Sequence, residues 1–88
     1  MDALELRGRL FAMLVCLDDR LPADQAALIH KFVDVGEWGL ALEQIADVLS
    51  EDEIGLHDEE RAELLAHNSR MEMGDRVPNA LGLCPSIH

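Results

Sequence analysis

The sequence predicts an all-α protein, a compact antiparallel bundle of about four helices with a C-terminal tail. The first observation is composition, because 15 Leu and 10 Ala stand among the 88 residues while aromatic residues make up only 3%. Leu and Ala are strong helix formers, whereas β-branched and aromatic residues favour strands. The second observation is that apolar residues recur at helical spacing in four segments joined by short connections, and short connections favour antiparallel neighbours. A chain of this length forms one domain.

The first helix is expected over residues 3–17, where apolar residues form two stripes. These are Leu6, Leu10, Met13 and Leu17 in one stripe and Leu4, Phe11 and Val15 in the other. Because the two stripes cover most of the circumference, the sequence predicts that this helix is the most buried of the four. Cys16 lies in the same apolar segment and is expected to be an inert, buried thiol.

The next three helices are bounded by turn-forming residues. Pro22 suits the first turn of a second helix that stops near Gly36. A third helix is expected from about residue 37 to 52 and a fourth from about residue 58 to 73. The inward faces are expected to be Trp38, Ala41, Leu42, Ile45 and Leu49 in the third helix, and Ala62, Leu65, Asn68 or Ser69, and Met71 or Glu72 in the fourth. Gly74 is a plausible C-cap of the fourth helix.

The sequence therefore divides into a helical bundle over residues 1–74 and a C-terminal tail over residues 75–88. The tail contains two prolines and several turn signals, so it is expected either to pack on the bundle or to be partly flexible. Val77, Leu81 and Leu83 are the apolar residues that would return it to the bundle.

Negative charge is concentrated in the centre of the chain. Residues 1–33 hold five acidic and four basic residues (net −1), residues 34–63 hold eleven and one (net −10), and residues 64–88 hold two and two (net 0). Phosphate binding needs clustered Lys and Arg. The charge therefore excludes nucleic acid and an anionic membrane as partners and favours a basic one.

No motif for catalysis or cofactor binding is apparent, so the chain is not expected to be an enzyme and no cofactor is expected. His30, His57, His67 and His88 lack the spacing of metal ligands, and no serine lies in a nucleophile motif. Two cysteines without a CxxC pair are typical of reduced thiols. With no export signal and no apolar stretch that could span a bilayer, the sequence predicts a cytoplasmic protein.

Acidic residues on the third and fourth helices are the candidate binding residues. Glu43, Asp47 and Glu51 fall on one helical face, and Glu59 and Glu63 repeat this spacing on the next helix. Like charges at that spacing destabilise a helix by about 0.2–0.5 kcal/mol per pair. The predicted partner-binding set is Glu37, Trp38, Glu43, Asp47, Glu51, Asp52, Glu53, Asp58, Glu59 and Glu63. A merely solvated acidic face and a binding surface remain alternatives for the carboxylates, as do a core anchor and an exposed hot spot for Trp38.

Two of these groups differ in their relation to the helix dipole. Asp58 and Glu59, with Glu60 beside them, are expected at a helix N-terminus, where the dipole favours negative charge and acidic residues are ordinary. Glu51, Asp52 and Glu53 are expected at a helix C-terminus, where the dipole opposes negative charge. Helix stability does not explain why acidic residues occupy this end. Their unfavourable position therefore favours a role in binding.

The central segment "DVGEWGLALEQIADVLSEDEIGLHDEERAELL", residues 34–65, resembles the MafI-type immunity proteins of bacterial polymorphic toxin systems. The resemblance lies in an acidic-aromatic "GEWGLA" stretch that opens one helix and a "DEER" start of the next. It implies a small helical cytoplasmic protein that binds and neutralises a cognate toxin domain. Such a toxin is often a nuclease, which must offer a basic surface to phosphates.

The resulting hypothesis is an immunity protein that inhibits a basic toxin domain through an acidic surface on its third and fourth helices. One alternative is an acidic helical adaptor or regulatory module without a toxin, for which a homodimer is possible. Another is a DNA mimic that occupies nucleic-acid-binding proteins, because it would share the same charge.

Overall fold

The computed structural model describes residues 3–87 and is all-α, as the sequence predicts. The elements are α1 (Ala3–Leu17), a short 3₁₀ helix η1 (Asp18–Arg20), α2 (Ala23–Asp34), α3 (Trp38–Glu51), β1 (Leu56–His57), α4 (Asp58–Arg70), α5 (Arg76–Leu81) and β2 (Ser86–Ile87). Pro22 is the N-cap of α2 and so immediately precedes its first turn.

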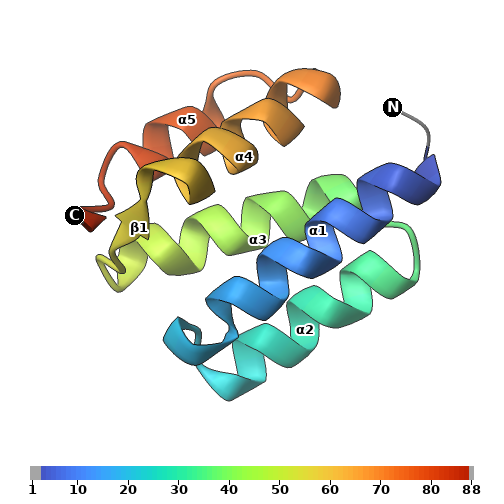
Figure 1. Cartoon of the computed structure of the whole chain (residues 1–88), viewed down its shortest axis with the longest axis horizontal. Helices are drawn as coiled ribbons and strands as arrows, with labels where there is room; N and C mark the ends of the chain where they lie inside the picture. Colours follow the sequence, from blue (N-terminus) through green and yellow to red (C-terminus); the bar gives the residue numbers. More distant parts are fainter. Residues whose placement is uncertain (1–2, 88) are drawn as a thin grey trace.

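Helix α3 lies at the centre of the bundle. Helices α1 and α2 lie on one side of it, and α4 and α5 lie on the other (Figure 1). Its inward residues are Ala41, Leu42, Ile45, Ala46, Val48 and Leu49, all of which are buried. The sequence predicts Ala41, Leu42, Ile45 and Leu49 but not Ala46 and Val48. The predicted Trp38 is half-buried and packs against the same core. The central helix therefore joins the two outer pairs.

The expectation that α1 is the most buried helix is wrong. Leu10, Leu14 and Leu17 are fully buried, but the second stripe is exposed, with fractions of 76% for Leu4, 49% for Phe11 and 56% for Val15. Because α1 lies at the edge of the bundle, its neighbours cover only one side of it. Cys16 is exposed for the same reason, so it is not the buried thiol that was expected.

The expected inner face of α4 is also wrong in part. The buried residues are Leu64, His67 and Asn68, whereas Ala62 is exposed. Asn68 is among the inward residues that the sequence predicts, but apolar periodicity does not detect the burial of the polar His67. Asn68 Nδ2 donates a hydrogen bond to the Gly74 carbonyl oxygen at 2.9 Å.

Helix α4 ends at Arg70, with Met71 as its C-cap, rather than near residue 73. Glu72 and Gly74 then adopt positive φ angles of 52° and 77°. This pair of left-handed residues turns the chain toward α5, so Gly74 belongs to the turn beyond the helix and is not the C-cap that was expected.

The segment after Gly74 forms α5 and a short strand. Val77 and Leu81 are buried against the core, while Leu83 is exposed. The two-residue strand β2 pairs in parallel with β1, with Leu56 opposite Ser86 and His57 opposite Ile87. The sequence does not predict this pairing, because two residues carry no strand periodicity.

Arg61 of α4 fixes the end of α5. Its guanidinium donates to the carbonyl oxygen of Leu81 and, at 2.8 Å, to that of Cys84. Leu81 is the last residue of α5, and its carbonyl oxygen also accepts from the Cys84 backbone N–H at 3.1 Å, so Arg61 adds a second donor there. The single basic residue of the acidic segment therefore has a structural role.

Candidate partner-binding surface

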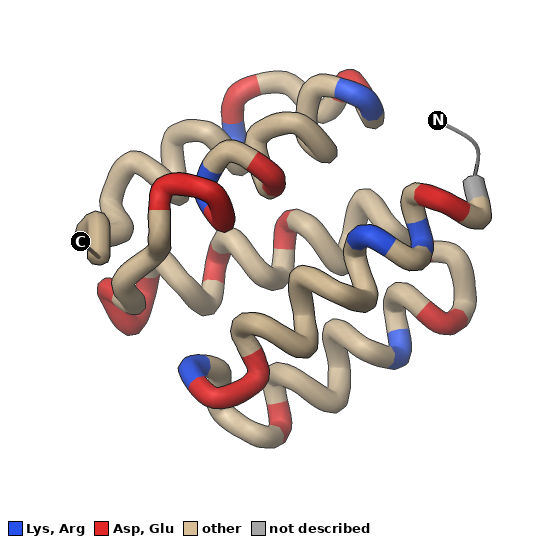
Figure 2. The backbone as a smooth tube through the Cα atoms, in the orientation of Figure 1, with Lys and Arg blue, Asp and Glu red and all other residues tan. Residues whose placement is uncertain are grey.

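The acidic positions at the end of α3 and the start of α4 gather at one end of the molecule (Figure 2). Residues 52–57 form the short connection that brings these two helix ends together. The predicted residues that are exposed are Glu37, Glu51, Asp52, Glu53, Asp58 and Glu59, and those that are half-buried are Trp38, Glu43, Asp47 and Glu63.

A groove of about 410 Å³ lies between the start of α2 and the end of α3. Its lining residues are Pro22, Asp24, Gln25, Gln44, Asp47, Val48, Glu51 and Asp52. Gln44 Nε2 donates to Gln25 Oε1 at 2.6 Å, so the two helices are joined beside the groove. Four carboxylates and no basic side chain line this hollow, which makes it suited to a cationic group of a partner.

Sequence reasoning missed Asp24 because this residue comes from a segment with balanced charge, far along the chain from Glu51 and Asp52. The packing of α2 against α3 brings the three carboxylates to one groove. Among the described residues, no ion pair involves Asp24, Glu51 or Asp52. The only signal in the sequence was that Asp24 lies in the first turn of a helix, which has an ordinary structural explanation.

Glu43 and Asp47 are not free members of an acidic stripe. Arg76 at the start of α5 donates to Glu43 Oε2 and Asp47 Oδ2, each at 2.6 Å. This arginine relieves the repulsion between the two carboxylates and ties α5 to α3. Of the three residues at i, i+4 and i+8, only Glu51 has no such partner among residues 3–87. The α3 carboxylates without an ion pair among the described residues are thus concentrated at its C-terminal end.

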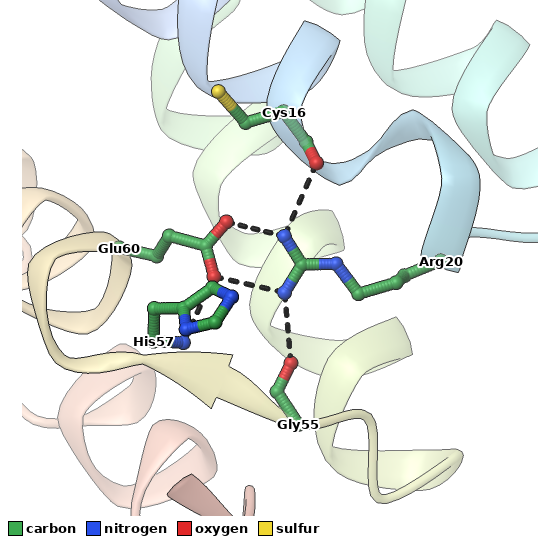
Figure 3. A network of polar contacts seen from close by, with 5 residues as sticks. All are labelled: Cys16, Arg20, Gly55, His57 and Glu60. Carbon is green, nitrogen blue, oxygen red and sulfur yellow. Dashed lines mark hydrogen bonds and ion pairs between the residues drawn. The ribbon is translucent and has the colours of Figure 1, made fainter. Parts of the chain in front are cut away.

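Glu60 at the start of α4 belongs to a structural network (Figure 3). Its carboxylate accepts two hydrogen bonds from the Arg20 guanidinium and one at 2.9 Å from the His57 backbone N–H. Arg20 also donates to the carbonyl oxygens of Gly55 at 3.0 Å and Cys16 at 3.1 Å. The hydrogen bonds from Arg20 lower the pKa of Glu60. Glu60 therefore holds α4 against the end of α1.

Glu63 faces the bundle rather than a partner. Its Oε1 atom lies 3.9 Å from Arg9 and 3.2 Å from Nε2 of His67. His67 is fully buried; its Nε2 has only this ion-pair contact with Glu63, and its Nδ1 has no hydrogen-bond partner among the described residues. Burial lowers the pKa of His67, against the opposing effect of the Glu63 carboxylate. This pair is consequently a weak candidate for partner binding.

Trp38 anchors the start of α3. Its indole Nε1–H donates to the Val33 carbonyl oxygen at 3.1 Å, and its ring packs against the core. The neighbouring Glu37 is exposed at the N-cap. This end of α3 is opposite the acidic groove, so the predicted residues form two separate surfaces.

The end of α3 carries negative charge where the helix dipole opposes it. The helix ends at Glu51, Asp52 is its C-cap, and Glu53 has a left-handed φ of 49°. We expect the double substitution Asp52→Lys and Glu53→Lys to raise the free energy of unfolding by about 0.3–1 kcal/mol per charge. Thermal and urea denaturation would measure this. A markedly less stable variant would mean that these residues take part in stabilising contacts.

Neither a metal site nor a membrane span is found in the described part of the chain. No group of three or more His, Cys, Asp or Glu side chains within residues 3–87 could hold a metal ion. No helix in that range has the length and apolar character to cross a membrane. Comparison of the chain with protein-family models, curated proteins and solved structures finds no match.

Proposed function

We propose that this protein is a cytoplasmic immunity protein that binds and neutralises a basic toxin domain through the acidic groove between α2 and α3. The observation that carries the proposal is the groove itself. Asp24, Glu51 and Asp52 line it without ion pairs among residues 3–87, beside Asp47. The resemblance of residues 34–65 to MafI-type immunity proteins supports the choice of a toxin as the partner.

The electrostatics suit rapid inhibition. A toxin that acts on nucleic acid must present Lys and Arg to phosphates. A chain of net charge −11 attracts such a surface over long range, and the groove would receive one of its basic side chains. The proposed role requires that the protein cover or distort the toxin; no bond is made or broken by the inhibitor.

The first test is protection in cells. A toxin domain encoded beside the gene for this chain would be expressed alone and together with it, and growth would be measured. The proposal expects the toxin alone to stop growth and co-expression to restore it. Inhibition of several unrelated DNA-binding proteins would instead favour the DNA mimic, and the absence of any complex with the neighbouring toxin would contradict the proposal.

The second test locates the interface. We expect the triple variant Asp24→Asn, Glu51→Gln and Asp52→Asn to associate with the toxin about tenfold more slowly, because steering by exposed charges acts chiefly on the association rate. The salt dependence of the rate should also become flatter. Stopped-flow measurements at low and physiological salt would give both quantities.

A matched control removes the same charge from the opposite end of α3. This variant combines Glu37→Gln, Glu72→Gln and Asp75→Asn, all at exposed positions that do not line the groove. The control should associate at a rate close to that of the wild type. If the control slows association and the groove variant does not, the interface lies around Trp38 and the groove assignment is wrong.

A further inference from the structure

The outward face of α1 has an arrangement that the fold itself does not require. Leu4, Gly8, Phe11 and Val15 follow one another at i, i+4, i+7 and i+11, and we call these four residues the α1 stripe. Leu4, Phe11 and Val15 are among the most exposed large apolar side chains of the described chain. A hollow of about 270 Å³ lies beside Gly8 and is lined by Leu4, Arg7, Gly8, Phe11 and Asp34.

Gly8 has no role in the isolated chain. An added Cβ at this position would meet no atom within 4 Å, and its φ is not in the left-handed region. A glycine inside a helix is less favourable than alanine by about 1 kcal/mol. A residue with this cost and no intrachain contact is typical of a place where another chain approaches closely.

Phe11 beside this hollow is already held in place. Its ring packs edge-on against His30, with the ring centres 5.6 Å apart and an interplanar angle of 69°. His30 Nε2 in turn lies 3.2 Å from Asp18 Oδ1. An aromatic ring that is fixed before binding loses little conformational freedom on association, which is a property of interface anchors.

We propose that the α1 stripe is a self-association surface that joins two copies of this chain in an antiparallel α1–α1 dimer. A two-fold axis that crosses α1 between Arg9 and Leu10 places Phe11 of each copy opposite Gly8 of the other. The same axis places Leu4 opposite Val15. One operation thus pairs all four members of the stripe, with the large ring facing the hollow, as an isologous interface requires.

Charge opposes a second copy less at this face than elsewhere on the molecule. The chain carries a net charge of −11, so two copies repel each other over most of their surfaces. Helix α1 holds one acidic residue, Glu5, and two basic ones, Arg7 and Arg9. In each of the other long helices of the described chain, α2, α3 and α4, acidic residues outnumber basic ones. Two charged groups that border the stripe, Arg7 and Asp34, pair at 3.4 Å.

The size of the stripe sets the strength of the dimer. Helix α1 has 15 residues and is about 22 Å long. Contact along one helix of this length falls below the roughly 1,200 Å² of a stable, standard-size interface. The dimer is therefore weak and depends on protein concentration. Screening of the overall repulsion strengthens it, so salt favours this dimer and weakens the binding of a basic toxin.

Sedimentation equilibrium of the full chain over a range of concentrations and salt tests the proposal. The wild type is expected to dimerise in the micromolar range, and more tightly at high salt. Phe11→Gln should weaken the dimer by about tenfold or more, as loss of a central aromatic anchor does. Leu40→Gln is the matched control, because Leu40 of α3 is 48% exposed and Phe11 is 49% exposed. It should leave the dimer unchanged.

The substitution Gly8→Leu distinguishes a specific dimer from non-specific hydrophobic association. Gly8 is exposed and a Cβ added there meets no atom within 4 Å, so the fold should be retained. In the dimer the added Leu occupies the place of the partner's Phe11 and should weaken association, whereas non-specific hydrophobic association would become stronger. A wild type that stays monomeric at all concentrations, equal effects of Phe11→Gln and Leu40→Gln, or stronger association of Gly8→Leu would overturn the proposal.

A distance between two spin labels distinguishes antiparallel from parallel packing of the two α1 helices. A spin label on the exposed Cys16 avoids the buried Cys84. Antiparallel packing about the proposed axis separates the two labelled positions by about 20 Å along the helix axis, because each residue rises by 1.5 Å. Parallel packing would leave them about 10 Å apart, the usual distance between helix axes, and would contradict the proposed pairing. None of these measurements uses a toxin, so their outcome is independent of the proposed function.

Discussion

Replacement of Arg20 by Met is expected to lower the free energy of unfolding by about 2–3 kcal/mol. The side chains of Arg20 and Glu60 are only 25% and 12% exposed, and the arginine also donates to two backbone carbonyls. The substitution keeps most of the aliphatic stem but leaves a half-buried carboxylate without its cation. Urea denaturation at neutral pH, followed by circular dichroism, measures the change.

The matched control for this substitution is Arg7→Met. Arg7 also pairs with a carboxylate, that of Asp34, but both side chains are largely exposed. An exposed pair contributes at most about 1 kcal/mol. The two variants therefore differ only in the burial and number of the contacts that are lost. If Arg20→Met costs no more than Arg7→Met, the network of Figure 3 does not hold α4 to the end of α1.

Replacement of His67 by Leu is expected to raise the free energy of unfolding by about 1–2 kcal/mol at pH 7 and to reduce its loss in acid. Leu is similar in size and removes two buried ring nitrogens, of which Nδ1 has no hydrogen-bond partner among the described residues and Nε2 has only the ion-pair contact with Glu63. Leaving such groups unsatisfied costs about 1–3 kcal/mol. A substantial loss of stability would mean that the imidazole makes a favourable interaction with Glu63.

The pH dependence of the free energy of unfolding follows from the direction in which burial shifts the pKa of His67. Burial lowers the pKa of His67 in the folded state, so the unfolded chain binds more protons as the pH falls. The stability linked to this group is present above its ordinary pKa of about 6.5 and is lost as the pH falls below that value. The lowered pKa of Glu60 adds a second loss below its ordinary value of about 4.5.

Denaturation from pH 4 to pH 8 should therefore show a loss of stability near pH 6 that the His67→Leu variant lacks. The loss below pH 4.5 should remain, because Glu60 and Arg20 are unchanged. His57→Asn is a suitable control, since it removes an exposed imidazole at the N-cap of α4, where Asn is itself a favoured residue, and should change the free energy of unfolding by no more than about 0.5 kcal/mol. Equal acid sensitivity of the wild type and His67→Leu would contradict the assignment.

The sequence alone determined the helical class and the position of the central helix. Ala41, Leu42, Ile45 and Leu49 are inward in the structure because a helix that is covered on several sides must bury a broad apolar face. The sequence also predicted where α3 ends and where α4 begins, because charged and turn-forming residues mark these boundaries. The concentration of acidic residues between positions 34 and 63 needed no structure either.

Only the tertiary structure decided which acidic residues are available to a partner. Glu43 and Asp47 pair with Arg76, and Glu60 pairs with Arg20, across 29 to 40 residues of chain. Helical periodicity relates residues within about two turns and says nothing about such distant partners. For the same reason the sequence could not assign Asp24 to the groove with Glu51 and Asp52.

The structure also decided which apolar residues stay exposed. The two stripes of α1 are equally apolar in the sequence, yet only the one with Leu10 and Leu17 is buried, because an edge helix has neighbours on one side. In α4 the reverse holds, since His67 and Asn68 are buried in spite of their polarity. Burial depends on what packs against a residue, and local sequence encodes only which residues share a face.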